Sequence, residues 1–210
     1  MPTTTYPASL SVDYPDRSLN RLTTFFRIFL AIPILVVLGT VAGGTWEWTR
    51  DDRTSSVAVG VGGILFFAPL LMIVFRQKYP RWWFDWNLEL QRFGNRVAAY
   101  LALMDDRYPS TDDHQSVHLD YEYPDAAVDL NRWLPLVKWL LALPHYIVLF
   151  FLQIAAFVVV IIAWFAILFT GRYPRSLFDF VEGVFRWHNR VIAYAFVLVT
   201  DEYPPFSLNP

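Results

Sequence analysis

Apolar residues in this chain gather into long runs. Residues 57–75 contain no charged side chain, and Lys138 is the one charge among residues 134–171. A helix that crosses a membrane needs about 20 apolar residues, at about 1.5 Å of rise per residue. The pattern therefore predicts transmembrane helices at residues 22–43, 57–75, 134–151 and 154–170.

A different pattern follows each apolar region. Apolar residues recur three or four positions apart with charged residues opposite, which predicts amphipathic helices suited to a membrane interface or a partner's groove. Their apolar positions are Trp86, Leu90, Phe93, Val97, Tyr100 and Met104 in the first helix and Phe180, Val184, Trp187, Val191, Tyr194 and Leu198 in the second. Residues 9–14 and 117–123 alternate instead, as a β-strand does, and each segment ends before a proline.

The two halves of the chain resemble each other. Asn131-Arg132 repeats Asn20-Arg21 at an offset of 111 residues. Tyr173-Pro174-Arg175 repeats Tyr79-Pro80-Arg81 at an offset of 94 residues. The smaller second offset indicates an insertion in the first copy, around residues 43–56.

The predicted fold class is an all-α membrane protein made of two parallel repeats, residues 1–110 and 111–210. Each repeat has a short strand-like segment, a transmembrane helical hairpin and a cytoplasmic-side amphipathic helix, which gives four transmembrane helices in total. An alternative makes residues 145–170 one tilted span. The positive-inside rule favours the hairpin, because a hairpin returns Arg132 and Arg172 to the same side. Both termini are then expected in the cytoplasm.

Several short motifs resemble those of a known family. Leu-Phe-Thr-Gly-Arg-Tyr-Pro at residues 168–174, Phe-Asp-Phe at 178–180 and Tyr-Pro-Pro-Phe-Ser-Leu at 203–208 resemble a bacterial multi-pass membrane family catalogued only as a domain of unknown function. The resemblance covers nearly the whole chain, once per copy, although Val74-Phe75-Arg76 replaces Leu-Phe-Thr in the first copy. It implies a location in the bacterial inner membrane and carries no activity, substrate or catalytic residue.

Charged residues on the amphipathic helices are the main candidates for binding. Carboxylates one or two turns before arginines commonly form ion pairs within a helix. Alternatively, the arginines hold the phosphates of anionic lipids, because a guanidinium group binds phosphate through two hydrogen bonds. The predicted anionic-lipid or partner surface consists of Arg92, Arg96, Arg186, Arg190, Asp85 and Asp179.

Two charges and two histidines fall near or within the apolar regions. Arg27 and Lys138 are expected to extend to the lipid headgroups, or to pair with Asp85 or Asp179 of the following helix. His145 and His188 are expected to be hydrogen-bonded structural residues rather than a metal pair or proton relay. The chain contains no cysteine, which excludes disulfides and thiolate chemistry.

The sequence contains no nucleotide-binding motif and no recognised catalytic motif. We therefore expect no catalytic residue, no cofactor and no bound metal. The leading hypothesis is a non-enzymatic membrane scaffold or accessory subunit that presents its amphipathic helices to lipids and to a partner. Membrane lipids and a membrane protein or a second copy of the chain are the expected partners, without nucleic acid. The alternatives are a small lipid or solute transporter working as an oligomer and, less favoured, a membrane enzyme.

Overall fold

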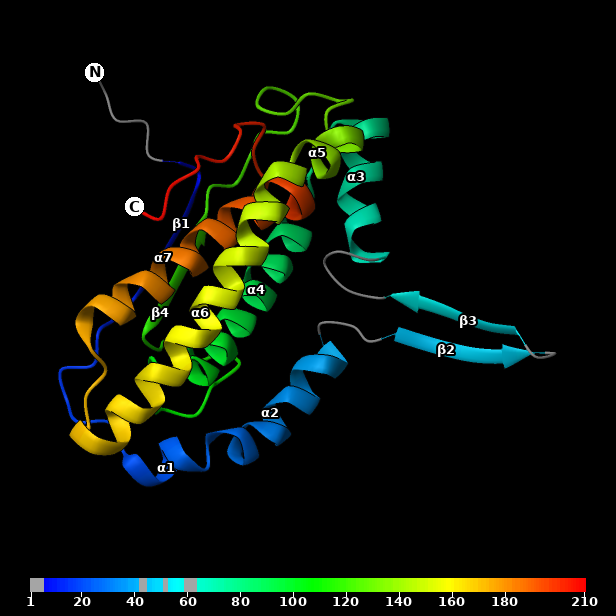
Figure 1. The fold of residues 1–210 in the computed structure, drawn as a ribbon. Helices are drawn as coiled ribbons and strands as arrows, with labels where there is room; N and C mark the ends of the chain where they lie inside the picture. Colours follow the sequence, from blue (N-terminus) through cyan, green and yellow to red (C-terminus); the bar gives the residue numbers. More distant parts are fainter. Residues whose placement is uncertain (1–5, 42–44, 51–52, 59–63) are drawn as a thin grey trace, which may run out of the picture.

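The computed structural model describes residues 6–41, 45–50, 53–58 and 64–210 (Figure 1). In chain order its elements are β1 (Ala8–Val12), α1 (Arg21–Phe25), α2 (Arg27–Val41), β2 (Thr45–Arg50), β3 (Arg53–Ala58), α3 (Ile64–Arg76), α4 (Arg81–Leu101), β4 (Val117–Tyr121), α5 (Pro135–Leu141), α6 (Leu143–Thr170), α7 (Arg175–Ile192) and the π-helical turn η1 (Ala193–Val197). Helices α4 and α7 form a middle layer. On one side α2 packs against α4 and α6 against α7, and on the other β4 packs against α4 and β1 against α7.

The amphipathic helices α4 and α7 are covered on both of their faces. Each begins directly after a proline in extended conformation, Pro80 or Pro174, which cannot continue a helix backwards. Apolar residues of α7 such as Phe178 and Val184 are fully buried, and the polar residues Arg186 and Arg190 are buried as well. Both sides of these helices therefore help to hold the fold together.

Helix α6 is continuous, and the predicted hairpin at residues 134–151 and 154–170 is wrong. No glycine or proline lies between the two predicted helices, so hydrogen bonding propagates without a break from Leu143 to Thr170. The helix ends at Gly171, whose φ of 74° is the left-handed conformation that glycine adopts without strain. The alternative of a single element over residues 145–170 agrees with the observed helix, and its crossing of a membrane stays a prediction.

Among the described residues, α6 is the one helix long and apolar enough to cross a membrane. Helix α2 has 15 residues, which at about 1.5 Å each span roughly 22 Å, less than the roughly 30 Å of hydrocarbon in a bilayer. Helix α3 is shorter still. The predicted fold with four transmembrane helices in two parallel repeats is therefore wrong.

The predicted insertion in the first half contains strands. Strands β2 and β3 form an antiparallel hairpin in which Thr45 lies opposite Ala58, and this hairpin projects away from the helices (Figure 1). The predicted all-α class is therefore also wrong. Residues 57 and 58 of the predicted span 57–75 belong to β3, residues 59–63 lie outside the described part of the chain, and α3 begins at Ile64.

The two strand-like segments pair with each other in the third layer. Strands β1 and β4 are antiparallel, with Leu10 opposite Leu119, and alternate residues of both strands are buried against the helices. The outward-facing positions are polar and include His118 and Asp120. Because β1 packs on α7 and β4 on α4, elements of the two predicted units are interleaved. The boundary between residues 110 and 111 stays a prediction.

Residues related by the sequence offsets make matching contacts. The side-chain Oδ1 of Asn20 caps α1 by accepting from Leu22 N at 2.9 Å, and Asn131 Oδ1 accepts from Trp133 N at 2.9 Å ahead of α5. The backbone N–H groups of Asn20 and Asn131 in turn donate to Asp106 and Asp201. The segment before α1 therefore lies beside the segment that follows α4, and the segment before α5 lies beside the segment that follows η1.

The second half has one extra residue at the end of its amphipathic helix, where a π-helical turn forms. Leu103 and Leu198 both have positive φ, 64° and 63°, at the end of an amphipathic helix. Leu198 follows Tyr194 by one residue more than Leu103 follows Tyr100. The extra residue widens the last turn of the second helix into η1, as single-residue insertions in helices commonly do.

Candidate functional site

Arg186 binds two segments that are distant in the sequence. Its Nε donates to Leu10 O of β1 at 3.0 Å, and its Nη1 donates to Leu208 O near the C-terminus at 2.9 Å. Its Nη2 pairs with Glu182 at 2.9 Å. This buried guanidinium group therefore joins α7, β1 and the C-terminal segment.

Arg190 continues the same arrangement one turn later. It donates to Ser207 O at 3.3 Å and to Asn209 O at 2.9 Å. The segment it binds lies so close to α7 that a Cβ at Gly183 would be 2.9 Å from Leu208 Cβ, closer than atoms tolerate. Glycine at this position permits the close approach, and the arginines hold it.

Arg92 and Arg96 of α4 make equivalent contacts with β4 and with the segment before it. Arg92 Nε donates to Leu119 O of β4 at 2.8 Å and Arg92 Nη1 pairs with Glu89 at 2.6 Å. Arg96 Nη1 donates to Ser110 O at 3.0 Å. The ion pairs within the helix that the sequence predicts are present for Arg92 and Arg186, and each arginine also binds main-chain carbonyl groups.

The two aspartates of the predicted surface lie apart from these arginines. Asp85 pairs with Arg81 at 3.1 Å and Asp179 pairs with Arg175 at 2.8 Å, in each case on an exposed first turn of the helix. The structure therefore divides the six predicted residues into four arginines bound to chain carbonyls and two exposed carboxylates. Their binding of anionic lipid or a partner stays a prediction.

Asn95 and Asn189 face each other where α4 and α7 meet. Asn95 Nδ2 donates to Asn189 Oδ1 at 2.8 Å, and Asn189 Nδ2 donates back to Asn95 Oδ1 at 2.7 Å. The remaining amide hydrogens bind Gln91 O and Phe185 O on their own helices. Tyr121 Oη also donates to Asn189, and burial raises the pKa of this hydroxyl. The hydrogen-bonding groups of the two asparagine side chains are therefore satisfied by groups of the protein itself.

Lys138 is fully buried and ion-paired. Its Nζ lies 2.6 Å from Asp201 Oδ1 and donates to Thr200 O at 2.7 Å. The expectation that Lys138 reaches the headgroups or pairs with Asp179 is therefore wrong. The partner carboxylate comes from the segment after η1, which the Asn131 contact has already placed beside α5.

Arg27 occupies the matching position but lacks the matching carboxylate. It is 2% exposed, and its Nη1 donates to Asp105 O at 2.9 Å while the guanidinium lies 4.0 Å from the centre of the Tyr100 ring. In the described part of the chain, its Nε and Nη2 have no hydrogen-bond partner. Asp106, the counterpart of Asp201, pairs with Arg17 instead. The expected headgroup contact or pairing with Asp85 is therefore wrong for Arg27 as well.

Asp105 connects the end of α4 to the start of β4. Burial alone would raise its pKa, but hydrogen bonds from Ser116 Oγ at 2.6 Å and from Arg107 N and Nε at 3.1 and 3.0 Å outweigh burial and lower the pKa. The carboxylate is therefore ionised at neutral pH, which adds negative charge near Arg17 and Arg27.

A cavity of about 670 Å³ lies beside Arg27, between α1, α2, α4, α6 and α7. Its walls are mainly apolar and include Ala98 and Ala156. The polar groups on its lining are Thr24, Arg27 and Gln153, and the buried Thr24 Oγ1, like the two Arg27 nitrogens, has no partner among the described residues. An apolar cavity with a few polar groups is the usual form of a small-molecule or lipid site.

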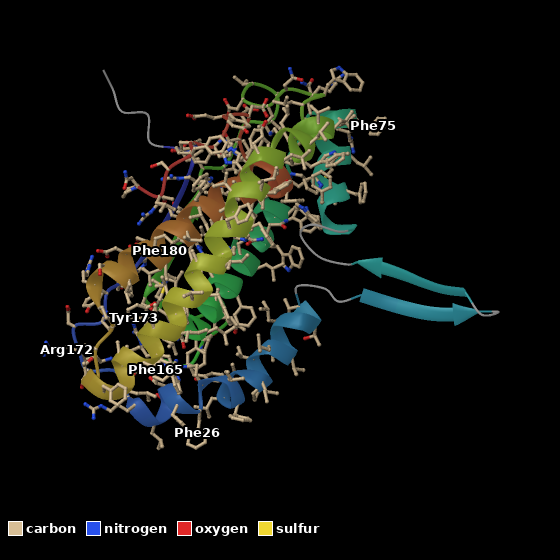
Figure 2. All side chains as sticks on the ribbon, viewed as in Figure 1. Phe26, Phe75, Phe165, Arg172, Tyr173 and Phe180 are labelled. Atoms are coloured by element: carbon tan, nitrogen blue, oxygen red, sulfur yellow. The ribbon has the colours of Figure 1, made fainter. Side chains whose placement is uncertain are left out.

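Exposed apolar side chains of α1, α2 and α6 border this cavity. We call the exposed apolar side chains of α1, α2, α5 and α6 the apolar surface. On α6 it consists of Leu143, Ile147, Val148, Phe150, Phe151, Ile154, Phe157, Val158, Ile161, Ile162, Phe165 and Phe169. Figure 2 shows Phe26 and Phe165 together at one end of the molecule and Phe75 of α3 at the opposite end. Only 17% of the most apolar stretch of α6 is buried, so α6 is not the core helix of a globular domain.

The histidines do not form a metal site in the described residues, where no group of three or more candidate ligands gathers. His145 is buried, and its Nδ1 accepts from Trp187 Nε1 at 3.0 Å. Its ring stacks on Phe206 at 3.9 Å. His145 therefore packs the C-terminal segment against α6 and α7, in agreement with the expected structural role.

Sequence reasoning missed the cavity and the carboxylates at Asp105 and Asp201. The offsets contain a signal for Asp201, because Asp106 follows Tyr100 by six residues and Asp201 follows the matching Tyr194 by seven. The cavity has no such signal. It depends on how α1 and α2 pack against α6, which periodicity within one segment does not determine.

Comparison with known protein families identifies a domain in one part of the chain. A domain of unknown function, DUF4389, is found at residues 133–207, which extend from just before α5 through α6 and α7 into the C-terminal segment. No curated protein and no solved structure matches the chain. The matched residues include Lys138 and Asp201, which form an ion pair. They also include Asn189, one of the two asparagines that bind each other. Membership of both halves in a tandem family stays a prediction.

Proposed function

We propose that this protein is a non-enzymatic membrane scaffold or accessory subunit. The observation that supports the proposal is the apolar surface, which lies on the side of α4 and α7 opposite to the β1/β4 sheet. Exposed apolar areas of this extent mark contacts with a membrane or a partner. The apolar surface holds the molecule in lipid, and the sheet with the adjoining chain ends faces water, where it is available to a partner.

The polar side chains between α4, α7 and the segments packed on them support a structural rather than a catalytic role. Among the described residues, four buried or half-buried arginines of α4 and α7 donate to main-chain carbonyls: Arg92, Arg96, Arg186 and Arg190. Asn95 and Asn189 donate to each other. A catalytic site needs a nucleophile or base held beside a space for substrate. The space next to Arg27 has apolar walls and contains a cation, which suits binding.

The two ends of the described chain lie on one side of the protein. Tyr6 Oη donates to Glu202 O at 3.2 Å, so the start of β1 and the C-terminal segment are neighbours. We propose that this side faces the cytoplasm at the bacterial inner membrane. Its partners are membrane lipids and either a membrane protein or a second copy of the chain, and nucleic acid is not expected.

Membrane binding through α6 can be tested with three exposed residues outside the cavity. We expect the triple variant Phe150→Gln, Phe151→Gln, Ile154→Gln to float with liposomes at least about a hundredfold less than wild type, because each apolar side chain contributes roughly 1.5–3 kcal/mol when buried in an apolar medium. The control replaces Phe150, Phe151 and Ile154 by Leu and should float like wild type. Equal flotation of the Gln and Leu variants, or absence of wild-type flotation, would contradict the proposal.

The cavity supports a second candidate function, transport of a lipid or small solute by an oligomer. Native mass spectrometry of the protein released from nanodiscs separates the two candidates. A reproducible protein partner supports the scaffold. A homo-oligomer that carries lipid or solute at fixed stoichiometry favours transport, and a bare monomer argues against both.

A further inference from the structure

We infer that the cavity beside Arg27 is a binding site for an anionic phospholipid, with one acyl chain along the apolar walls and the phosphate at Arg27 and Thr24. This inference rests on the proposed membrane location and adds a specific lipid site to it. It differs from the predicted surface of α4 and α7 arginines, because Arg27 lies at the start of α2.

The apolar part of the site matches an acyl chain in shape and chemistry. The cavity is bounded by Phe25 and Ile28 on one side and by Phe157, Ile161 and Phe165 of α6 on the other. All five of these side chains belong to the apolar surface, so the cavity opens where the proposed function places lipid. A lipid of the surrounding leaflet can therefore enter sideways without crossing water.

The charge of Arg27 indicates an anionic headgroup for the lipid. Lys138, the counterpart of Arg27, is neutralised by Asp201, whereas no carboxylate pairs with Arg27 in the described part of the chain. A buried cation without a direct ion-pair partner is unfavourable, and a guanidinium group with unpartnered N–H groups is suited to bind phosphate. Thr24 Oγ1, also unpartnered, adds a hydroxyl donor on the same wall.

The polar edge of the structure lies at the same end of the cavity. The backbone carbonyl that accepts from Arg27 belongs to Asp105, which pairs with the exposed Arg17 and Arg107. A phosphate bound at Arg27 would thus lie near Arg17 and Arg107, whose charges offset those of Asp105 and Asp106. Its acyl chain would run toward Ala156 near the middle of α6.

Lipid retention measures the proposal directly. The protein is reconstituted with equal amounts of phosphatidylglycerol and phosphatidylcholine, extracted in mild detergent and analysed by native mass spectrometry. We expect about one phosphatidylglycerol per wild-type chain and about a tenfold loss of retention in Arg27→Gln, since one charge-assisted hydrogen bond is lost. Arg27→Lys, which keeps the charge, should retain an intermediate amount.

Two further variants separate the site from its surroundings. Ala98→Phe leaves Arg27 in place but fills the cavity, and it should lose phosphatidylglycerol to a similar extent even if Arg27→Gln proves unstable. Arg21→Gln removes an exposed cation at the start of α1 and should retain the lipid.

Equal retention of phosphatidylglycerol and phosphatidylcholine would overturn the inference, and so would wild-type retention by both Arg27→Gln and Ala98→Phe. Liposome flotation of the same proteins distinguishes this failure from failure of the membrane proposal. All of these variants should float like wild type, because the residues of α6 that were tested by flotation are unchanged in them.

Discussion

Two asparagine side chains satisfy each other at the point where α4 and α7 meet. Each amide makes one hydrogen bond to its counterpart as donor and one as acceptor, and the second N–H group of each binds its own helix. A single substitution would therefore leave the other amide partly unpaired in a buried position. This pair is the smallest unit of the structure in which the two halves of the chain depend on each other.

We predict that Asn95→Ala and Asn189→Ala each lower the free energy of unfolding by about 1–3 kcal/mol, because each leaves a buried amide unsatisfied. The double variant should lose less than the sum of the single variants, by at least about 0.5 kcal/mol, since both partners are then removed. Chemical unfolding of the four proteins in detergent micelles measures this coupling. Strict additivity would show that the two amides act independently.

Single residues also show where sequence patterns stop being informative. Asn95 and Asn189 stand out in the sequence as matching polar positions, yet the offset does not reveal that they bind each other. Lys138 is a lone charge in an apolar run, and helix-end rules predict that such a side chain extends to the surface. Its burial depends on Asp201, which lies 63 residues away and approaches only after α6 and α7 have folded back.

At the scale of elements, periodicity predicted α4 and α7 well because both are long and strongly two-sided. The same principle failed for α6, whose apolar residues surround the helix and define no face. Length alone then had to distinguish one helix from two, and the charge rule favoured the wrong choice. The β2–β3 hairpin was missed because a glycine-rich, charged stretch is typical of a loop.

The amphipathic helices stabilise the fold through their polar faces as well as their apolar faces. Removing Arg186 deprives Leu10 O and Leu208 O of a donor and leaves Glu182 without its cation. We predict that Arg186→Gln lowers the free energy of unfolding by about 3 kcal/mol, the range found when one partner of a buried charged pair is deleted. Thermal unfolding in detergent, with limited proteolysis of the C-terminal segment, measures the effect.

Arg175 provides the matched control on the same helix. It also pairs with a carboxylate, Asp179, but the two side chains are 63% and 49% exposed. Arg175→Gln should therefore cost less than about 0.5 kcal/mol. If Arg186→Gln were equally mild, the carbonyl contacts of Arg186 would contribute little, and the arginines of α7 would be available for the predicted lipid surface.

At the scale of the whole molecule, the layers restrict how α6 can meet a bilayer. Ala156 near the middle of α6 lines the cavity with Val181 of α7, and Glu182, the next residue of α7, accepts from Val12 N of β1. A bilayer perpendicular to α6 would therefore contain the β1/β4 sheet as well. Open sheet edges do not occur in contact with hydrocarbon, and the exposed Asp120 would cost about 3 kcal/mol or more at that depth.

Placing α6 along the membrane removes this conflict. The apolar surface then enters one leaflet, and the sheet lies two helix layers away in water. This arrangement also satisfies the charge pattern that favoured a hairpin, because the exposed Arg132 and Arg172 near the two ends of the α5–α6 region stay on the same side. One long apolar helix and the positive-inside rule are compatible once the helix does not cross.

Depth measurements along α6 test this orientation. Ile147, Ile154 and Ile161 are all exposed and seven residues apart, so they lie on nearly the same face and are separated by about 10 Å each along the axis. Spin labels at cysteines introduced singly at these positions should show nearly equal depths in liposomes, as judged by accessibility to oxygen and to a water-soluble nickel chelate. A crossing helix would instead place successive labels roughly 10 Å apart in depth, about a third of the hydrocarbon thickness. The three cysteine variants serve as controls for one another, because the label and the helix face are the same in each. A depth profile that changes steeply from Ile147 to Ile161 would show that α6 crosses the bilayer and would require the sheet to detach from α7.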